Sequence, residues 1–530
     1  MVAAHYDVVI IGAGMTGAGV AVDAASRGLK VALIDRGDIA SGTSSKSSKM
    51  VHGGLRYLQE KEFRLVYENL RERQRLLENA PFLVRPLPFL IPLFGRDGVV
   101  SRAVIKGHST ALWIYDISGG WRIGKRHQRV SRLQTLAHLP TLNSESLVAG
   151  FLYFDARGDD ARVALTLAKT AALDYGADVV NYVRAIEITH QRDGRANGVV
   201  CHDEIDDTSF TLSTSTIVNA TGVWADDIFT LAENKPSHRI TPAKGVHLSV
   251  PRHRLPADVA AVLRVPGDRR SIFIVPFEEA PYTFIGTTDT TYQGTKDSPL
   301  CTPNDVAYLL NAVNASTSSS LTASDVTGVW AGLRPLLAPT KGKRMSVRTA
   351  DLSRRHQVTD SHDGVIHITG GKWTTYRQMA EDTVNALSPY FTKLGRVRTK
   401  NLRLHGCGAW RPSTALESHL YDRYGADSLL IIAMIATDPS LEAAPIANQP
   451  YVGAEFVFGV RHEMATSLVD LLTRRTRAHL LDARACVAAA PVIARLVASD
   501  FGWSEEQVKQ QVADYQTLVE HEFAASGLSL

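Results

Sequence analysis

Three glycines near the start of the chain have the spacing of a turn that binds a dinucleotide. The apolar run Val8–Ile11 is typical of a short buried parallel strand, and Gly12, Gly14 and Gly17 follow it directly. The first glycine permits a tight turn, the second lets the backbone approach a pyrophosphate, and the third lets the next helix pack closely on the strand. The N-terminus of that helix would face the phosphate charge. The pattern predicts a dinucleotide site without distinguishing FAD from NAD.

An acidic residue and a polar segment follow this turn. Asp35 ends the next apolar strand, about twenty residues after the glycines, where its carboxylate can accept a hydrogen bond from a ribose hydroxyl. The composition of Arg36–Lys49 is typical of a flexible linker, but its position beside the cofactor predicts phosphate and ribityl donors. In this part of the chain the expected cofactor-binding residues are Gly12, Gly14, Met15, Thr16, Gly17, Asp35, Arg36, Thr43, Ser44, Ser45, Ser47 and Ser48.

A pair of adjacent glycines comes next. His52 precedes Gly53 and Gly54, and the pair suggests that the backbone approaches a flat ligand closely, so we add these three residues to the cofactor-binding set. Arg56 and Tyr57 then bring a cation and a phenol beside the cofactor. The alternative for Arg56 is a surface salt bridge, which contributes little to stability.

Small-residue turns after later strands predict further approaches to the cofactor. A strand that ends at Asn219 leads into one such turn, and the strand Gly364–Ile368 leads into two glycines, Lys372 and a helix N-terminus with hydroxyls. The second arrangement suits an anion, although a solvated surface charge is the alternative for the lysine. With a valine expected near the adenine, the added cofactor-binding residues are Val183, Ala220, Thr221, Gly222, Trp224, Gly371, Lys372, Thr374 and Thr375.

Length, charge and cysteine content limit the class of protein. The 530 residues are too many for one ordinary core, so we expect two or three domains. The net charge of +4 is too small for a nucleic-acid-binding protein. Four scattered cysteines predict neither disulfides nor a metal site and fit a reducing cytoplasm. No apolar window has the length of a membrane-spanning helix, so any membrane contact should be peripheral.

The segment Leu93–Ile117 has the composition of such a contact. Basic residues such as Arg102 and Lys106 are interspersed with apolar ones such as Val104 and Trp113. A basic amphipathic segment with an interfacial tryptophan can lie on anionic lipid. An ordinary helix packed on the body of the protein is the alternative.

Several motifs occur together in a specific order, and together they resemble the motifs of a known family. They are His52–Tyr57, Asn219–Gly222, Gly286–Asp289, Gly332–Pro335, Gly371–Arg377, Arg461–Met464 and Leu472–Thr476. Over essentially its whole length the chain resembles the FAD-dependent glycerol-3-phosphate dehydrogenases. The resemblance implies FAD, oxidation of sn-glycerol 3-phosphate to dihydroxyacetone phosphate, a quinone acceptor, and a cytoplasmic protein held peripherally on the inner face of the cell membrane. Asp35 is often Glu in that family, a change that the ribose contact tolerates.

Other flavoproteins stand as alternatives. A glycerol-3-phosphate oxidase would use oxygen and release hydrogen peroxide, and an amine oxidase would need a carboxylate clamp in place of a phosphate pocket. A non-catalytic FAD-binding or RNA-modifying assembly protein is disfavoured by the modest net charge and by the lack of zinc ligands in the sequence. The oligomeric state stays open, and a homodimer could form through the C-terminal helices.

The order of the predicted elements indicates an α/β fold. We expect a Rossmann-type FAD-binding domain with an inserted antiparallel β-sheet substrate domain and an all-α C-terminal domain. Strand patterns run from Lys244 to Asp289, and beyond about residue 398 only helical patterns occur. The expected limits are 1–90, 150–240 and 330–395 for the FAD-binding domain, 91–149 and 241–329 for the substrate or cap domain, and 398–530 for the helical domain.

The implied reaction assigns roles to the charged residues. A hydride leaves carbon 2 for flavin N5 while the hydroxyl proton is removed. Arg56 and Arg334, on separate glycine-flanked segments, could bind the phosphate through bidentate hydrogen bonds. Lys372 and the helix N-terminus beside it could stabilise negative charge on the reduced flavin.

A histidine is the expected base. His247 follows Lys244 and Gly245 on a strand of the substrate sheet, and imidazole titrates near neutral pH. His52 and Lys372 are rivals, and plain packing is the alternative for His247. The expected catalytic residues are Arg56, His247, Arg334 and Lys372. The expected substrate-binding residues, of which Thr288 and Asp289 could instead form a structural turn, are Arg56, Tyr57, His247, Thr288, Asp289, Arg334 and Lys372.

Overall fold

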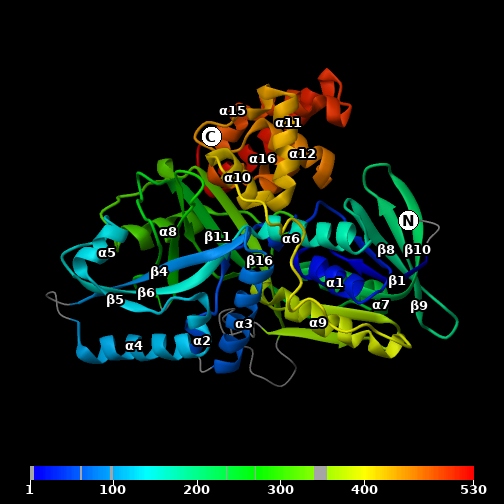
Figure 1. Ribbon diagram of the computed structural model, residues 1–530, viewed down its shortest axis with the longest axis horizontal. Helices are drawn as coiled ribbons and strands as arrows, with labels where there is room; N and C mark the ends of the chain where they lie inside the picture. The colour runs from blue at the N-terminus through cyan, green and yellow to red at the C-terminus, as the bar shows by residue number, and fades with distance from the viewer. Residues whose placement is uncertain (1–4, 60–61, 96–99, 234, 269, 339–354) are drawn as a thin grey trace.

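Two β-sheets lie side by side, with the last helices of the chain above the junction between them (Figure 1). The computed structural model describes residues 5–59, 62–95, 100–233, 235–268, 270–338 and 355–530. The predicted α/β fold is confirmed. None of the described helices is both long and apolar enough to cross a bilayer.

The first sheet carries the dinucleotide turns. From β18 to β7 its pairs are parallel, and parallel strands bring the turns at their carboxyl ends to one edge. In pairing order the strands are β17 (His356–Asp360), β18 (Val365–Gly370), β10 (Thr208–Asn219), β1 (His5–Ile11), β2 (Val31–Ile34) and β7 (Asp178–Val180), with β9 (Ala196–Asp203) on β10 and β8 (Val183–His190) on β9.

Both faces of this sheet are covered, which explains the unbroken apolar runs of its central strands. Val8 and Ile10 pack with three helices, whereas Val9 and Ile11 pack with the hairpin of β8 and β9 on the other face. Alternate side chains of a strand point to opposite faces, so neither set reaches water. The three helices are α1 (Met15–Ser26), α6 (Asp160–Lys169) and α9 (Tyr376–Ala386).

The second sheet is antiparallel except for the pair β4 and β12. In pairing order its strands are β15 (Thr290–Thr291), β11 (Ile240–Pro251), β14 (Tyr282–Gly286), β13 (Ser271–Pro276), β12 (Ala260–Arg264), β4 (Val84–Phe94), β6 (Leu147–Gly158) and β3 (Met50–Val51), with β16 (Gly328–Leu337) on β11 and β5 (Gln128–Ser131) on β6. Its helices are α2 (Arg56–Gln59), α3 (Phe63–Asn79), α4 (Arg102–Ile117), α5 (Arg132–His138) and α8 (Pro303–Asn314).

Residues 90, 150 and 330, the predicted domain limits, fall inside β4, β6 and β16 of the second sheet. Strand β4 contains three prolines, which are unusual inside a sheet. Pro86, Pro88 and Pro92 occupy alternate positions, so they remove N–H donors from one edge of the strand only and the strand persists. The division of the chain into three domains itself stays a prediction.

The C-terminal residues form helices, as predicted. Met464 has a left-handed backbone, which ends the helix Gly453–Glu463, and a π-helical turn, Leu471–Arg475, follows the short helix Leu468–Asp470. Below, "C-terminal helices" denotes residues 415–526. They are α10 (Ala415–Tyr424), α11 (Ser428–Thr437), α12 (Gly453–Glu463), α13 (Leu468–Asp470), α14 (Ala478–Leu481), α15 (Ala483–Phe501) and α16 (Glu505–Ser526).

Candidate functional site

A cavity of about 1300 Å³ joins the two sheets. The turns after β1, β10 and β18 form one part of its wall, and residues of β4, β11, β13 and β16 form another. Its size suits a dinucleotide together with a small substrate, because a single drug-sized ligand occupies about 300–1,000 Å³. The strand ends of the first sheet thus meet the inner face of the second.

Close contacts surround the glycines of the first turn, with backbone atoms at Gly12 and Gly17 and with a side chain at Gly14. Gly12 has a φ of +104°, and a Cβ there would lie 2.8 Å from the carbonyl oxygen of Ala220. A Cβ on Gly17 would lie 1.7 Å from the carbonyl oxygen of Gly12, and one on Gly14 would lie 3.0 Å from Oγ of Ser44. The glycine roles predicted from spacing therefore correspond to real contacts, and the cradle fits the pyrophosphate of FAD.

Asp35 lies at the cavity wall, where a ribose contact requires it. Its carboxylate accepts hydrogen bonds from the backbone N–H groups of Ala13, at 2.7 Å, and Gly37, at 2.9 Å. Burial raises the pKa of Asp35 to about 6, against the opposing effect of these two donors. Nearby, the guanidinium of Arg36 lies 4.7 Å from the ring centroid of Trp224, so two predicted cofactor residues stack on each other.

The polar residues 36–49, the cofactor segment from here on, pack between the two sheets. Ser44 Oγ accepts a hydrogen bond from the N–H of Met15, at 2.8 Å, and Thr43 Oγ1 donates to the carbonyl of Leu333 in β16, at 2.6 Å. The indole of Trp330 adds a weaker hydrogen bond to the segment. These contacts favour the cofactor interpretation of the segment over the linker alternative.

A buried network that sequence reasoning missed holds the double glycine. The N–H of Gly53 donates to Oη of Tyr115, at 2.9 Å, and to Oδ1 of Asp155, at 3.2 Å. Arg73 donates to the same Asp155 oxygen at 2.7 Å, and Asn69 donates to the carbonyl of Gly53. Burial raises the pKa of Asp155, while the Arg73 guanidinium opposes the rise. A Cβ on Gly53 would lie 2.5 Å from Tyr115 Oη, so only glycine fits.

The histidine predicted as base is buried in an aromatic and cationic setting. His247 Nε2 lies 2.7 Å from Ser48 Oγ, and its ring stacks on Trp330 with centroids 4.9 Å apart. Burial, together with the cations of Arg334 and Lys49, lowers the pKa of His247 well below its usual value. The lowered pKa favours the unprotonated imidazole, which is the form that a general base requires.

The other substrate candidates of the second sheet gather around Arg334. Its guanidinium contacts Thr287 Oγ1 and the carbonyl of Thr288, each at 3.3 Å, and Asp289 at 3.4 Å. A Cβ on Gly245 would lie 2.5 Å from Nη2 of Arg334, so a side chain at this position would clash with the guanidinium. The prediction that Thr288, Asp289 and Arg334 share one region is therefore consistent with the fold.

Lys372 and Tyr57 also meet at the cavity. The ammonium of Lys372 lies 3.8 Å from the ring centroid of Tyr57, a close cation–π contact. Arg56 begins α2, but its side chain lies outside the described residues.

Most predicted site residues line the cavity, although their binding roles stay predictions. Those that do are Gly12, Gly14, Met15, Thr16, Asp35, Arg36, Thr43, Ser44, Ser47, Ser48, His52, Gly54, Tyr57, Ala220, Thr221, Gly222, Trp224, His247, Thr288, Asp289, Arg334, Gly371, Lys372 and Thr374. The remaining described ones lie behind the wall and shape it through backbone contacts: Gly17, Ser45, Gly53, Val183 and Thr375.

Some lining residues were not predicted. Lys46, Arg184 and Thr287 are next to predicted residues, so proximity along the chain was a usable signal for them. Arg270, just before β13, had no such signal, because the pairing of β13 with β14 brings it to the cavity.

Two family descriptions together match most of the chain. Residues 7–377 match the family described as FAD dependent oxidoreductase, and residues 365–508 match the C-terminal domain of alpha-glycerophosphate oxidase. Glycerol-3-phosphate dehydrogenase 2 of Mycobacterium tuberculosis is 39% identical over 98% of this chain and 88% of its own length. The mitochondrial glycerol-3-phosphate dehydrogenase of Rattus norvegicus is 34% identical over 96% of this chain and 72% of its own length.

A solved structure is similar over almost the whole chain. The glycerol-3-phosphate dehydrogenase from Bacillus halodurans, complexed with FAD, superposes with a TM-score of 0.78 at 30% identity, covering 98% of this chain and 95% of that one. The C-terminal helices are therefore included in the likeness.

The contact between Gly17 and Gly12 makes the first turn testable. Gly17→Ala places a Cβ against a backbone oxygen that cannot move aside cheaply, so the affinity for FAD should fall by at least ~10-fold, about 1.4 kcal/mol. Titration of deflavinated protein with FAD measures this. Gly107→Ala in α4 is the control, since nothing lies within 4 Å of its Cβ. Equal affinities for the two variants would contradict the prediction.

Proposed function

The chain belongs to the family of FAD-dependent glycerol-3-phosphate dehydrogenases, and on that premise we propose that it oxidises sn-glycerol 3-phosphate to dihydroxyacetone phosphate with a quinone as electron acceptor. One observation carries the substrate proposal: a neutral histidine, His247, shares a dinucleotide cavity with the cations Arg334 and Lys372. A phosphorylated alcohol needs cations for its phosphate and a neutral base for its hydroxyl proton.

In this proposal the residues of the chain bind, orient and move a proton. FAD, when bound, supplies the hydride acceptor. Arg334 binds the phosphate, because its planar fork is oriented by Thr287, Thr288 and Asp289. The alcohol proton goes to the imidazole of His247, whose low pKa keeps it unprotonated before the reaction.

The base is positioned by the same segment that lines the cofactor site. Ser48 Oγ, in the cofactor segment, lies within hydrogen-bonding distance of His247 Nε2. Trp330 supports the ring from one face, and it also donates to the carbonyl of Ser47. The spacing between base and cofactor therefore depends on one short stretch of chain.

The substrate and the acceptor can be tested in one experiment. Under anaerobic conditions sn-glycerol 3-phosphate, but not glycerol or an amino acid, should bleach the yellow protein, and a quinone analogue should restore its absorbance. If air reoxidises the flavin faster than the quinone does, and one hydrogen peroxide forms per turnover, the protein is a glycerol-3-phosphate oxidase instead. An amino acid that bleaches the protein would contradict the substrate proposal.

The role of Arg334 predicts a change in KM. Arg334→Lys loses bidentate hydrogen bonding to the phosphate, so KM should rise by about ten- to a hundredfold, or about 1.4–2.7 kcal/mol, with the flavin spectrum unchanged. Arg254→Lys is the matched control, since Arg254 makes a similar two-point pair with Asp325 outside the cavity lining. Unchanged kinetics in Arg334→Lys would remove this arginine from the substrate site.

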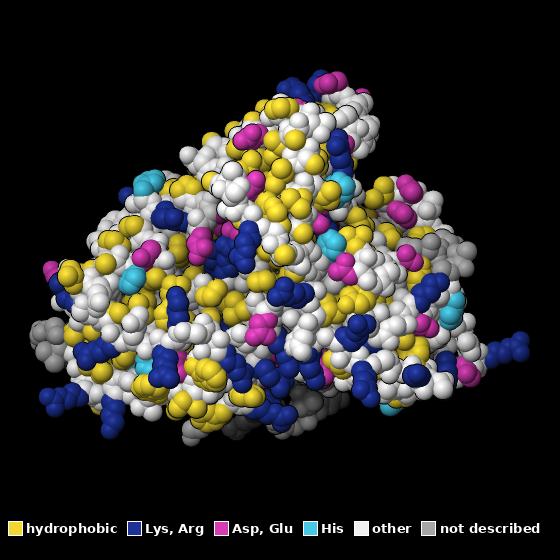
Figure 2. All heavy atoms as spheres, in the orientation of Figure 1, with side chains coloured by type: hydrophobic (Ala, Val, Ile, Leu, Met, Phe, Trp, Pro, Cys, Tyr) yellow, Lys and Arg dark blue, Asp and Glu magenta, His cyan; other side chains and the backbone are white. Residues whose placement is uncertain are grey.

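A peripheral contact with the inner face of the cell membrane is a further part of the proposal. Along α4, Val104, Trp113 and Ile117 are exposed together with Arg102 and Lys106. Figure 2 shows hydrophobic and basic side chains interspersed along the lower edge of the molecule, where α4 lies in Figure 1. Such a surface suits anionic lipid, which would bring the site to a membrane quinone. A homodimer stays a prediction.

Vesicle flotation tests this surface. The double variant Trp113→Ala, Arg102→Ala should bind anionic liposomes more weakly than the wild type, because it loses an apolar anchor and about 1 kcal/mol of attraction for the charge. The control, Leu429→Ala with Arg461→Ala, removes an exposed pair of the same kind from the C-terminal helices. If both variants float equally with the wild type, α4 is not the contact.

A further inference from the structure

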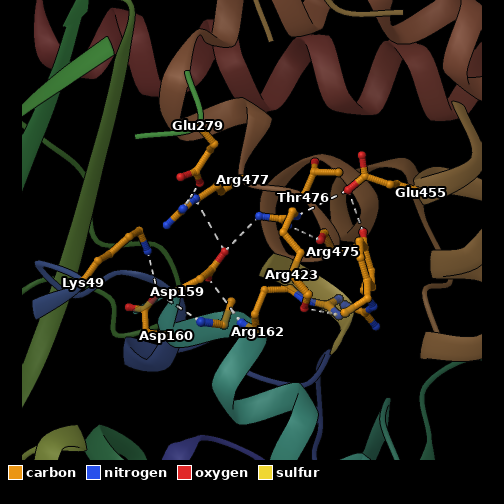
Figure 3. Close-up of polar contacts among 12 residues, drawn as sticks. Lys49, Asp159, Asp160, Arg162, Glu279, Arg423, Glu455, Arg475, Thr476 and Arg477 are labelled. Carbon is orange, nitrogen blue, oxygen red and sulfur yellow. Dashed lines mark hydrogen bonds and ion pairs between the residues drawn. The ribbon is translucent and has the colours of Figure 1, made fainter. Parts of the chain in front are cut away.

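Helix α6 begins with two buried aspartates that contact different parts of the molecule (Figure 3). Asp160 accepts hydrogen bonds from the Lys49 ammonium, at 2.5 Å, and from the N–H of Ser47, at 2.9 Å. Both donors belong to the cofactor segment, and Asp160 itself lines the cavity. The start of α6 therefore supports the segment that faces the cofactor.

Asp159 is held by two arginines of the C-terminal helices. Its carboxylate lies 3.6 Å from Nη1 of Arg423 and 3.6 Å from Nε of Arg477. Burial alone would raise the pKa of Asp159, but the cations of Arg477, Lys49 and Arg423 lower it to about 2. Arg423 also donates to the carbonyl of Arg475, at 2.9 Å, so the arginines form one connected cluster (Figure 3).

A second contact joins the same two parts of the molecule. Asp38, three residues after the ribose acid, accepts hydrogen bonds from Nη1 and Nη2 of Arg475, at 2.7 and 2.8 Å, and from Nε of Arg474, at 2.5 Å. The Arg475 pair is bidentate and buried on both sides. Burial opposes ionisation, yet the two guanidinium groups hold the pKa of Asp38 far below its ordinary value.

The loop after β7 shares these contacts. Asn181 donates to Oδ1 of Asp38, at 3.0 Å, and to the carbonyl of Met464 at the end of α12, at 2.9 Å. Two residues on, the N–H of Val183 donates to the carbonyl of Asp35, at 2.7 Å. Both loops at the ribose end of the cavity are therefore held together with the C-terminal helices.

We infer that the C-terminal helices set the affinity for FAD by holding the cofactor segment in its binding conformation, with Arg474 and Arg475 as positioning residues. The segment is rich in Ser and also contains two Gly, and one short 3-10 turn is its regular structure, so its intrinsic preference for this conformation is weak. Ordering such a segment opposes binding, and a segment that is ordered beforehand spares the cofactor that cost.

The coupling is reciprocal. If the arginines favour the conformation that binds FAD, then FAD must favour the conformation that binds the arginines, by the same factor. The C-terminal helices contribute no residue to the cavity lining within the described chain, so they act through the segment. The inference holds whichever compound accepts the electrons.

Removal of the bidentate guanidinium of Arg475 is the direct test. Arg475→Gln should raise the Kd of deflavinated protein for FAD by at least ~10-fold. The Kd is measured by the quenching of flavin fluorescence. The rise in melting temperature on adding FAD should shrink accordingly. With FAD saturating, KM for sn-glycerol 3-phosphate should change by less than ~2-fold, because the substrate residues are intact. Arg461→Gln, which breaks an exposed pair with Asp500 in the same helical part, should keep the wild-type Kd.

A second pair of variants separates positioning from general stability. Arg475→Lys keeps the charge but not the fork and should give an intermediate Kd; it carries the test if Arg475→Gln does not fold. In an Asp38→Asn background the effect of Arg475→Gln on the Kd for FAD should largely vanish, because both substitutions remove the same contact, the one between Asp38 and Arg475. The inference is overturned if the arginine variants lower the melting temperature while the Kd for FAD stays within ~2-fold of wild type. It is also overturned if Asp38→Asn and Arg475→Gln change the Kd independently of each other.

Discussion

Buried carboxylates beside the cofactor segment require counter-charges, and the rest of the structure is arranged to supply them. Asp38, Asp159 and Asp160 are almost completely buried, where an unpaired charge costs several kcal/mol. Lys49 neutralises one of them from within the segment. Arg475 reaches Asp38 across 437 residues of sequence. The C-terminal helices are thereby tied to the dinucleotide fold by charge as well as by apolar packing.

The same segment connects the two chemical ends of the cavity. Ser44 caps the helix that follows the glycine turn, and Ser48 contacts His247 on the second sheet. Burial and the cations of Arg334 and Lys49 lower the pKa of His247, and this setting exists only when segment, sheet and Arg334 are assembled. The proposed proton acceptor and the cofactor segment therefore depend on one piece of folded structure.

Much of the fold and of the site could be predicted where the physical cause is local. The glycine turn, Asp35 and the covered strands follow from sterics and apolar periodicity within a few residues. Strand β4 contains three prolines, residues that usually mark a break, and only its pairing with β6 in the tertiary structure retains it as a strand. Arg73 and Asp155 were missed because Arg73 contacts Asp155, and Asp155 contacts Gly53, from separate elements of the fold. The side chain of Arg56 lies outside the described residues.

The sequence by itself determined the turns that cradle the cofactor, the alternation of strands and helices, and the family, since motif order and short-range geometry encode these. Only the tertiary structure decided which strands share a sheet, which carboxylates face which arginines, and that His247 is buried beside cations that lower its pKa. Those properties come from contacts between residues hundreds of positions apart, and from the loss of water around them. Neither the distance between two side chains nor their solvation can be read from a linear order of residues.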